Sequence, residues 1–163
     1  MNFWDLIVLA IPIGIVATLI MDAAGWTQKH LLNVPQLDYA FVGRWLMAMR
    51  DGRFRHEMIM QSPAQPFERP VGWALHYLTG IAFVAIMLGL TGPGWVERPT
   101  IWAPLAAGLL SVAAPFFVMQ PAFGFGMAAS KTPTPWTVRR RSLIAHLSFG
   151  VGIYWAGLLL SVA

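Results

Sequence analysis

Long apolar runs without lysine or arginine dominate the pattern of this chain. About 20 apolar residues in a helix cover the hydrocarbon core of a bilayer. Three runs have roughly this length, and the run at 100–130 exceeds it. The pattern therefore predicts four membrane-spanning helices, at 5–25, 72–93, 100–120 and 142–162. The runs are continuous and do not alternate with polar residues, which favours a helical bundle over a barrel.

The segments between these runs predict two cytoplasmic loops, at 27–70 and 121–141, within a single domain of residues 1–163. The stretch 37–50 is apolar, but Asp38 and Arg44 interrupt it, which predicts an interfacial or buried helix. Pro63, Pro66 and Pro70 should end any helix before the second span. The second loop, rich in glycine, proline and alanine, predicts irregular backbone or a re-entrant turn.

The basic residues predict the orientation. Of the 11 lysines and arginines, six lie in the first loop and four in the second, whereas Arg98 alone lies between spans two and three. Cytoplasmic loops are enriched in lysine and arginine. We therefore predict a multi-pass protein of the bacterial inner membrane with both termini outside.

Composition narrows the function classes. The chain is 57% hydrophobic and 11% charged, whereas a soluble domain has about 25% charged residues. A net charge of +4 is too small for binding along a nucleic-acid backbone. The absence of cysteine excludes disulfides and thiolate metal ligands. We expect the bilayer as partner, with anionic lipid headgroups and a homo-oligomer as further candidates.

Two short patterns recur and suggest that the chain is a repeat of two helix pairs. The second and fourth predicted spans each begin with His-x-x-x-Gly, at 76–80 and 146–150. The first and third spans end with methionine and a polar residue, at Met21 and Met119. Such pairs would be related by an axis along the membrane normal.

Polar residues at membrane depth are the candidates for function, because each charged group there costs about 2.5–3.5 kcal/mol. Counted along the helices, four of them should share one level in the cytoplasmic leaflet: Asp22, His76, Gln120 and His146. His56 and Glu68 should close this level from the first loop. Taken singly, each residue also has a structural explanation, such as a helix cap or a hydrogen bond between helices.

The leading hypothesis is a metal site, which could be catalytic. Two histidines and one carboxylate suit zinc, iron or manganese, and the predicted ligands are Asp22, His76, His146, His56 and Glu68. The alternatives are a haem held by His76 and His146, transport of a solute or proton by an oligomer, and a non-catalytic membrane assembly protein. The candidate substrate- or lipid-binding residues are Arg44, Arg53, Arg69, Gln120 and Lys131.

An ordered set of motifs resembles a family of bacterial membrane proteins known as domain of unknown function 2938. The motifs are Met21-Asp22, Gly43-Arg-Trp45, Gly52-x-Phe-x-His56, Glu68-x-x-x-Gly-Trp73, His76-Tyr77, Gln120-Pro121, Gly124-x-Gly126 and His146. The resemblance runs from about residue 10 to 155. It implies a multi-span inner-membrane protein of this length, and it implies no activity, cofactor or catalytic residue.

Overall fold

The computed structural model describes residues 3–34, 36–92 and 94–162. In this part of the chain every regular element is helical. The long helices are α1 (Phe3–Leu32), α3 (Glu68–Thr91) and α7 (Pro135–Ser161), and α5 (Trp102–Ser111) begins a fourth long stretch, which lies between α3 and α7 in the sequence. Four stretches are long and apolar enough to span a membrane: Trp4–Leu31, Glu68–Thr91, Trp102–Ala122 and Pro135–Ser161.

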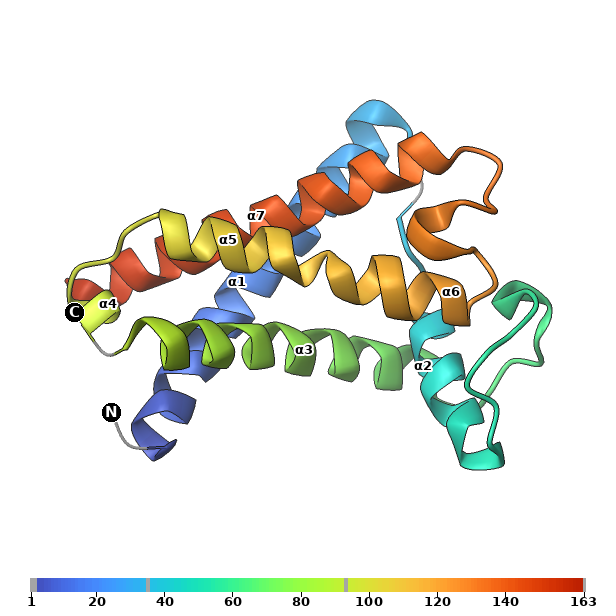
Figure 1. The fold of residues 1–163 in the computed structure, drawn as a ribbon, viewed down its shortest axis with the longest axis horizontal. Coiled ribbons are helices and arrows are strands. Elements are labelled where there is room, and N and C mark those ends of the chain that lie inside the picture. Colours follow the sequence, from blue (N-terminus) through green and yellow to red (C-terminus); the bar gives the residue numbers. More distant parts are fainter. Residues whose placement is uncertain (1–2, 35, 93, 163) are drawn as a thin grey trace.

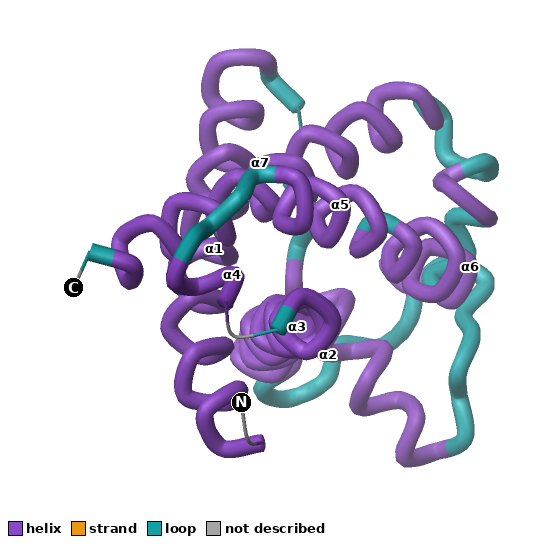
Figure 2. Tube along the Cα trace, turned by 60° about the vertical axis from the view of Figure 1, so that its left-hand side comes forward, coloured by secondary structure: helices purple, strands orange, loops and turns teal. Residues whose placement is uncertain are grey.

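The four long stretches pack as a bundle (Figure 1). α1 contacts α3 and α7, and α5 packs on α7. α1 begins and α7 ends at one end of the bundle, beside the short helix α4 (Gly94–Glu97), while α2 (Tyr39–Ala48) and α6 (Gln120–Ala122) lie at the other end. Figure 2 looks nearly along α3, with the other long helices around it. Buried side chains of α1, α3 and α7, including Ile13, Leu88 and Ile153, form the core.

Three spans extend beyond their predicted limits. α3 begins at Glu68 and not at 72, and Pro70, expected to end any helix before this span, lies in its first turn, where proline is tolerated. α1 continues past 25 to Leu32, since Gln36 packs against Gly25 and Gln28 is buried. α7 begins at Pro135 and not at 142, because proline suits the first turn of a helix. The last seven residues of the predicted second loop, 135–141, are therefore helical.

The third span, predicted as one helix, is discontinuous. α5 ends at Ser111, a π-helical turn covers Ala114–Met119, and α6 follows. Pro115 lies inside this turn and has no N–H to donate to the preceding turn, which accounts for the break. Beyond α6 the backbone is irregular, as predicted, with Gly124 and Gly126 at positive φ.

The helix predicted at 37–50 is confirmed as α2 and a 3₁₀ turn at Met49–Asp51. It lies directly against α3. A Cβ atom at Gly43 would overlap the Glu68 carbonyl, and one at Gly72 would overlap the Tyr39 carbonyl. The two helices are therefore in backbone contact through a pair of glycines.

The two segments predicted as loops also meet. His56 N–H donates to the Ala122 carbonyl at 2.8 Å, and Ile59 N–H donates to the Phe123 carbonyl at 3.1 Å. Ile59 and Phe123 are fully buried in a second apolar cluster that includes Val42 of α2. This cluster fixes α2 and α6 at one end of the bundle.

We expect Gly43→Ala and Gly72→Ala each to destabilise the protein by about 1–3 kcal/mol, because overpacking must separate α2 from α3. Thermal unfolding in detergent measures the effect. Gly89→Ala, also in α3, is the matched control, since the nearest atom to its new Cβ is 3.6 Å away. If Gly72→Ala melted like Gly89→Ala, the close approach of the two helices would be disproved.

Candidate functional site

A cavity of about 690 Å³ lies between α1, α3, the broken third span and α7, with α2 beside it. Its wall is mostly apolar and includes several aromatic rings, those of Trp26, Tyr39, Trp45, Trp73, Phe83 and Phe149. The four polar residues expected at one level, Asp22, His76, Gln120 and His146, all line this cavity. They therefore lie around one cavity, while their common depth in the cytoplasmic leaflet stays a prediction.

Asp22 is the centre of a hydrogen-bonded network that joins three helices. Its Oδ1 lies 3.0 Å from His76 Nε2, and its Oδ2 accepts a hydrogen bond of 3.0 Å from the Tyr77 hydroxyl. Because a carboxylate only accepts, His76 Nε2 must carry a proton. The α1 carboxylate is thus held by two neighbouring residues of α3, and we call the first contact the Asp22–His76 pair.

Tyr39 of α2 completes this network. Its hydroxyl lies 3.0 Å from His76 Nε2, and its ring stacks on the imidazole with a centroid distance of 4.3 Å. Burial, and then the negative charge of Asp22, raise the pKa of the Tyr39 hydroxyl well above its ordinary value. The phenol therefore keeps its proton, and its oxygen is placed to accept a hydrogen bond from the same Nε2–H of His76.

His146 is held in one tautomer by Ser111. The Ser111 hydroxyl donates its hydrogen to the Gly108 carbonyl at 2.7 Å, since a carbonyl can only accept. The contact of 2.7 Å between Ser111 Oγ and His146 Nδ1 must then be a hydrogen bond donated by Nδ1. His146 Nε2 therefore keeps its lone pair. This nitrogen can act as a hydrogen-bond acceptor or as a base in the cavity wall.

Three polar side chains of the wall, those of Thr18, Gln28 and Gln120, are almost completely buried. Thr18 is 1% exposed, Gln28 6% and Gln120 3%. Thr18 Oγ1, Gln28 Nε2 and Gln120 Oε1 have no hydrogen-bond partner among the described residues. A buried polar atom without a partner costs about 1–3 kcal/mol.

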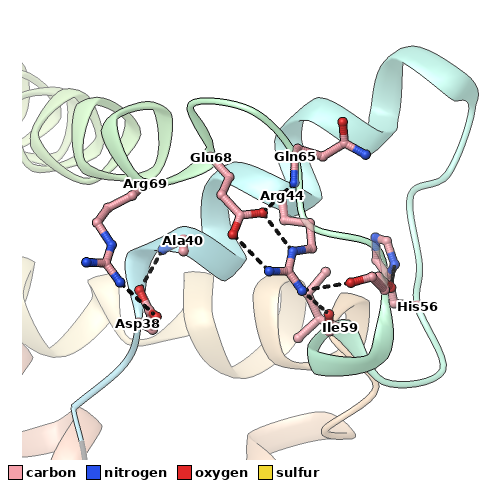
Figure 3. Close-up of polar contacts among 9 residues, drawn as sticks. Asp38, Ala40, Arg44, His56, Ile59, Gln65, Glu68 and Arg69 are labelled. Carbon is pink, nitrogen blue, oxygen red and sulfur yellow. Dashed lines mark hydrogen bonds and ion pairs between the residues drawn. The ribbon is translucent and has the colours of Figure 1, made fainter.

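Two predicted members of the site lie elsewhere. Glu68 forms a buried ion pair with Arg44, with two contacts of 2.8 Å, and Arg44 also donates to the carbonyls of Ile59 and Ser62 (Figure 3). His56 Nδ1 lies 2.8 Å from Ser62 Oγ. The expectation that Glu68 and His56 close the polar level is therefore wrong, because Arg44 and Ser62 are their partners.

The predicted metal ligands do not come together. The described residues contain no group of three or more histidine, aspartate or glutamate side chains that could hold a metal ion. Asp22 and His76 are in contact, whereas His146 binds Ser111. A metal at the Asp22–His76 pair would need its other ligands from water or a bound molecule.

The predicted substrate- or lipid-binding residues also separate. Gln120 lines the cavity, while Arg44 is used within the buried ion pair. Arg53 and Lys131 are exposed and do not line the cavity. Arg69 is exposed and lies 3.5 Å from Asp38.

Sequence reasoning missed several residues of the wall. Thr18 lies one helical turn before Asp22, and Ser111 precedes the break in the third span. Helical spacing could have revealed Thr18. Arg141 lines the cavity because α7 begins early, although the pattern had placed this arginine in a loop.

The two His-x-x-x-Gly segments have corresponding positions in the fold. A Cβ at Gly80 of α3 would overlap Thr18 of α1, and one at Gly150 of α7 would lie 2.6 Å from the Pro104 carbonyl of α5. Each glycine thus allows close approach to the preceding long helix, and the histidine one turn earlier lines the cavity. The polar partners differ, since His76 binds Asp22 and His146 binds Ser111.

Comparison with known families agrees with the family resemblance that the ordered set of sequence motifs indicated. Residues 11–160 match the model of the family described as "Protein of unknown function (DUF2938)". The chain belongs to this family. The match includes every residue of the Asp22 network and the cavity wall. Neither the curated proteins nor the solved structures contain a match to the chain.

We expect Arg44→Ala to destabilise the protein by about 3–5 kcal/mol, because it leaves the Glu68 carboxylate buried without its ion-pair partner. Arg69→Ala removes an arginine from an exposed ion pair and should cost less than about 1 kcal/mol. Thermal unfolding of both variants in the same detergent tests this difference. Equal losses would show that the Arg44–Glu68 contact contributes no more than a surface pair.

Proposed function

We propose that this protein binds an amphipathic small molecule in its cavity, within the bacterial inner membrane. The observation that carries the proposal is the cavity of about 690 Å³, whose lining combines aromatic rings with the polar residues Thr18, Gln28 and Gln120. They line a largely apolar cavity beside the Asp22–His76 pair. Ligand sites generally combine such walls with a few polar groups that fix orientation.

The chemistry of the wall indicates what the ligand offers. Aromatic rings such as Trp45 and Phe149 favour an apolar body. The lone pair on His146 Nε2 favours a ligand that donates a hydrogen bond at its inner end. Asp22 can accept further hydrogen bonds. A carboxylate has about four acceptor positions, and His76 and Tyr77 each occupy one of them.

The proposed orientation puts both termini outside the cell and α2 on the cytoplasmic side. Ten of the 11 lysines and arginines lie in the segments 27–70 and 121–141. We expect alkaline phosphatase fused after the last residue to be active, because it folds only outside. A fusion after Ser130 should be inactive. Activity in the reverse pattern would overturn the orientation.

Filling the cavity should expel the ligand. Ala145 lines the cavity, whereas its neighbour Ile144 in α7 is exposed. We expect protein purified in mild detergent to retain an amphipathic molecule in about equimolar amount, and Ala145→Phe to lose most of it. Solvent extraction followed by mass spectrometry measures the retained molecule.

Ile144→Phe is the matched control, because it adds an aromatic ring on the outer face of the same helix. It should keep the molecule at the level of the unmodified protein. Thermal unfolding verifies that both variants are folded. Identical extracts from the two variants would overturn the proposal.

A further inference from the structure

A second, smaller cavity of about 420 Å³ adjoins the first. We call it the vestibule, and it is lined by Lys29, Gln36, Leu37, Asp38, Tyr39, Arg69 and Trp73. Four of these residues, Gln36, Leu37, Tyr39 and Trp73, also line the larger cavity. The two cavities therefore share a wall, in which the Tyr39 and Trp73 rings pack together at a centroid distance of 4.3 Å.

The two cavities differ in chemistry. The larger one is mostly apolar, whereas the vestibule has two basic side chains, Lys29 from the last turn of α1 and Arg69 from the first turn of α3. Asp38 is the acidic residue of its described lining. The vestibule thus carries an excess of positive charge next to an apolar chamber.

The positive charge is incompletely compensated. Asp38 Oδ1 accepts the N-cap hydrogen bond from Ala40 N–H, and its Oδ2 lies 3.5 Å from Arg69, a long contact between two exposed side chains. Lys29 has no hydrogen-bond or ion-pair partner within the described residues. One lysine and most of the Arg69 guanidinium are therefore available to an anion.

We propose that the vestibule binds the negatively charged headgroup of an anionic amphiphile of the bilayer, whose apolar body occupies the larger cavity. This inference rests on the proposed function and names the class of its ligand. Basic pockets between membrane helices at the cytoplasmic side bind anionic headgroups, and each basic residue strengthens the attraction about fivefold. The shared wall at Tyr39 and Trp73 is where headgroup and body would join.

Native mass spectrometry of the detergent-solubilised protein tests the charge preference. The probes are lysophosphatidylglycerol, which is anionic, and lysophosphatidylcholine, which has no net charge, with the same acyl chain. We expect the anionic probe to bind at least fivefold more tightly. Lys29→Gln and Arg69→Gln should each weaken binding of the anionic probe about fivefold. Neither substitution should change binding of the probe without net charge.

Asp38→Asn should act in the opposite direction. It removes the competing negative charge, while asparagine preserves the N-cap of α2, so binding of the anionic probe should strengthen severalfold. Lys131→Gln is the control for loss of a basic residue outside the vestibule, because Lys131 is exposed and lines neither cavity. It should change the affinity for neither probe.

The outcomes separate the two proposals. If Ala145→Phe abolishes binding of both probes but the unmodified protein binds them equally, the cavity function stands and the vestibule inference is overturned. Loss of affinity in Lys131→Gln equal to that in Lys29→Gln would also overturn it, since the effect would then be one of overall charge. If Ala145→Phe changes neither probe, the proposed function itself fails.

Discussion

The Asp22 carboxylate, half-buried among apolar helices, is the constraint on which the rest of the site depends. A charged group in such apolar surroundings must be paired or hydrogen-bonded. His76 and Tyr77 supply that pairing from α3, and Tyr39 reaches His76 from α2. One carboxylate therefore determines the relative position of three helices. The position of Tyr39 in turn requires α2 to lie in backbone contact with α3, which Gly43 and Gly72 allow.

The Arg44–Glu68 ion pair supports the same arrangement at the start of α3. Arg44 joins Glu68 at the start of α3 to the carbonyls of Ile59 and Ser62. It thereby links α2, α3 and the loop between them (Figure 3). The planar guanidinium matches the two oxygens of the carboxylate in geometry, which makes such a pair specific as well as strong. Glu68 thus acts on the site indirectly, by fixing the helix that carries Tyr39.

Sequence patterns predicted the four apolar stretches and the gathering of Asp22, His76, Gln120 and His146, because helix length and depth follow from simple counting. They did not predict the partners. Glu68 and His56 were expected beside the histidines, yet partners of loop residues depend on tertiary contacts that no periodicity encodes. The start of α7 was predicted too late. The arginines at 139–141 were assigned to a loop because of their charge, whereas the helix already begins at Pro135. The break at Pro115 was also missed, because its apolar neighbours continue the hydropathy pattern through the π turn.

The broken third span explains why polar atoms remain unpaired in an otherwise well-bonded interior. A regular helix would satisfy its own backbone and rotate Gln120 to a different face, whereas the π turn adds a residue per turn just before it. Gln120 is consequently buried in the cavity wall with Oε1 unpartnered. Thr18 and Gln28 have the same property on α1, on either side of Asp22. These residues line one cavity together with the Asp22–His76 pair and His146, and this convergence of polar side chains from separate elements is the basis for our proposal that the cavity is the functional centre.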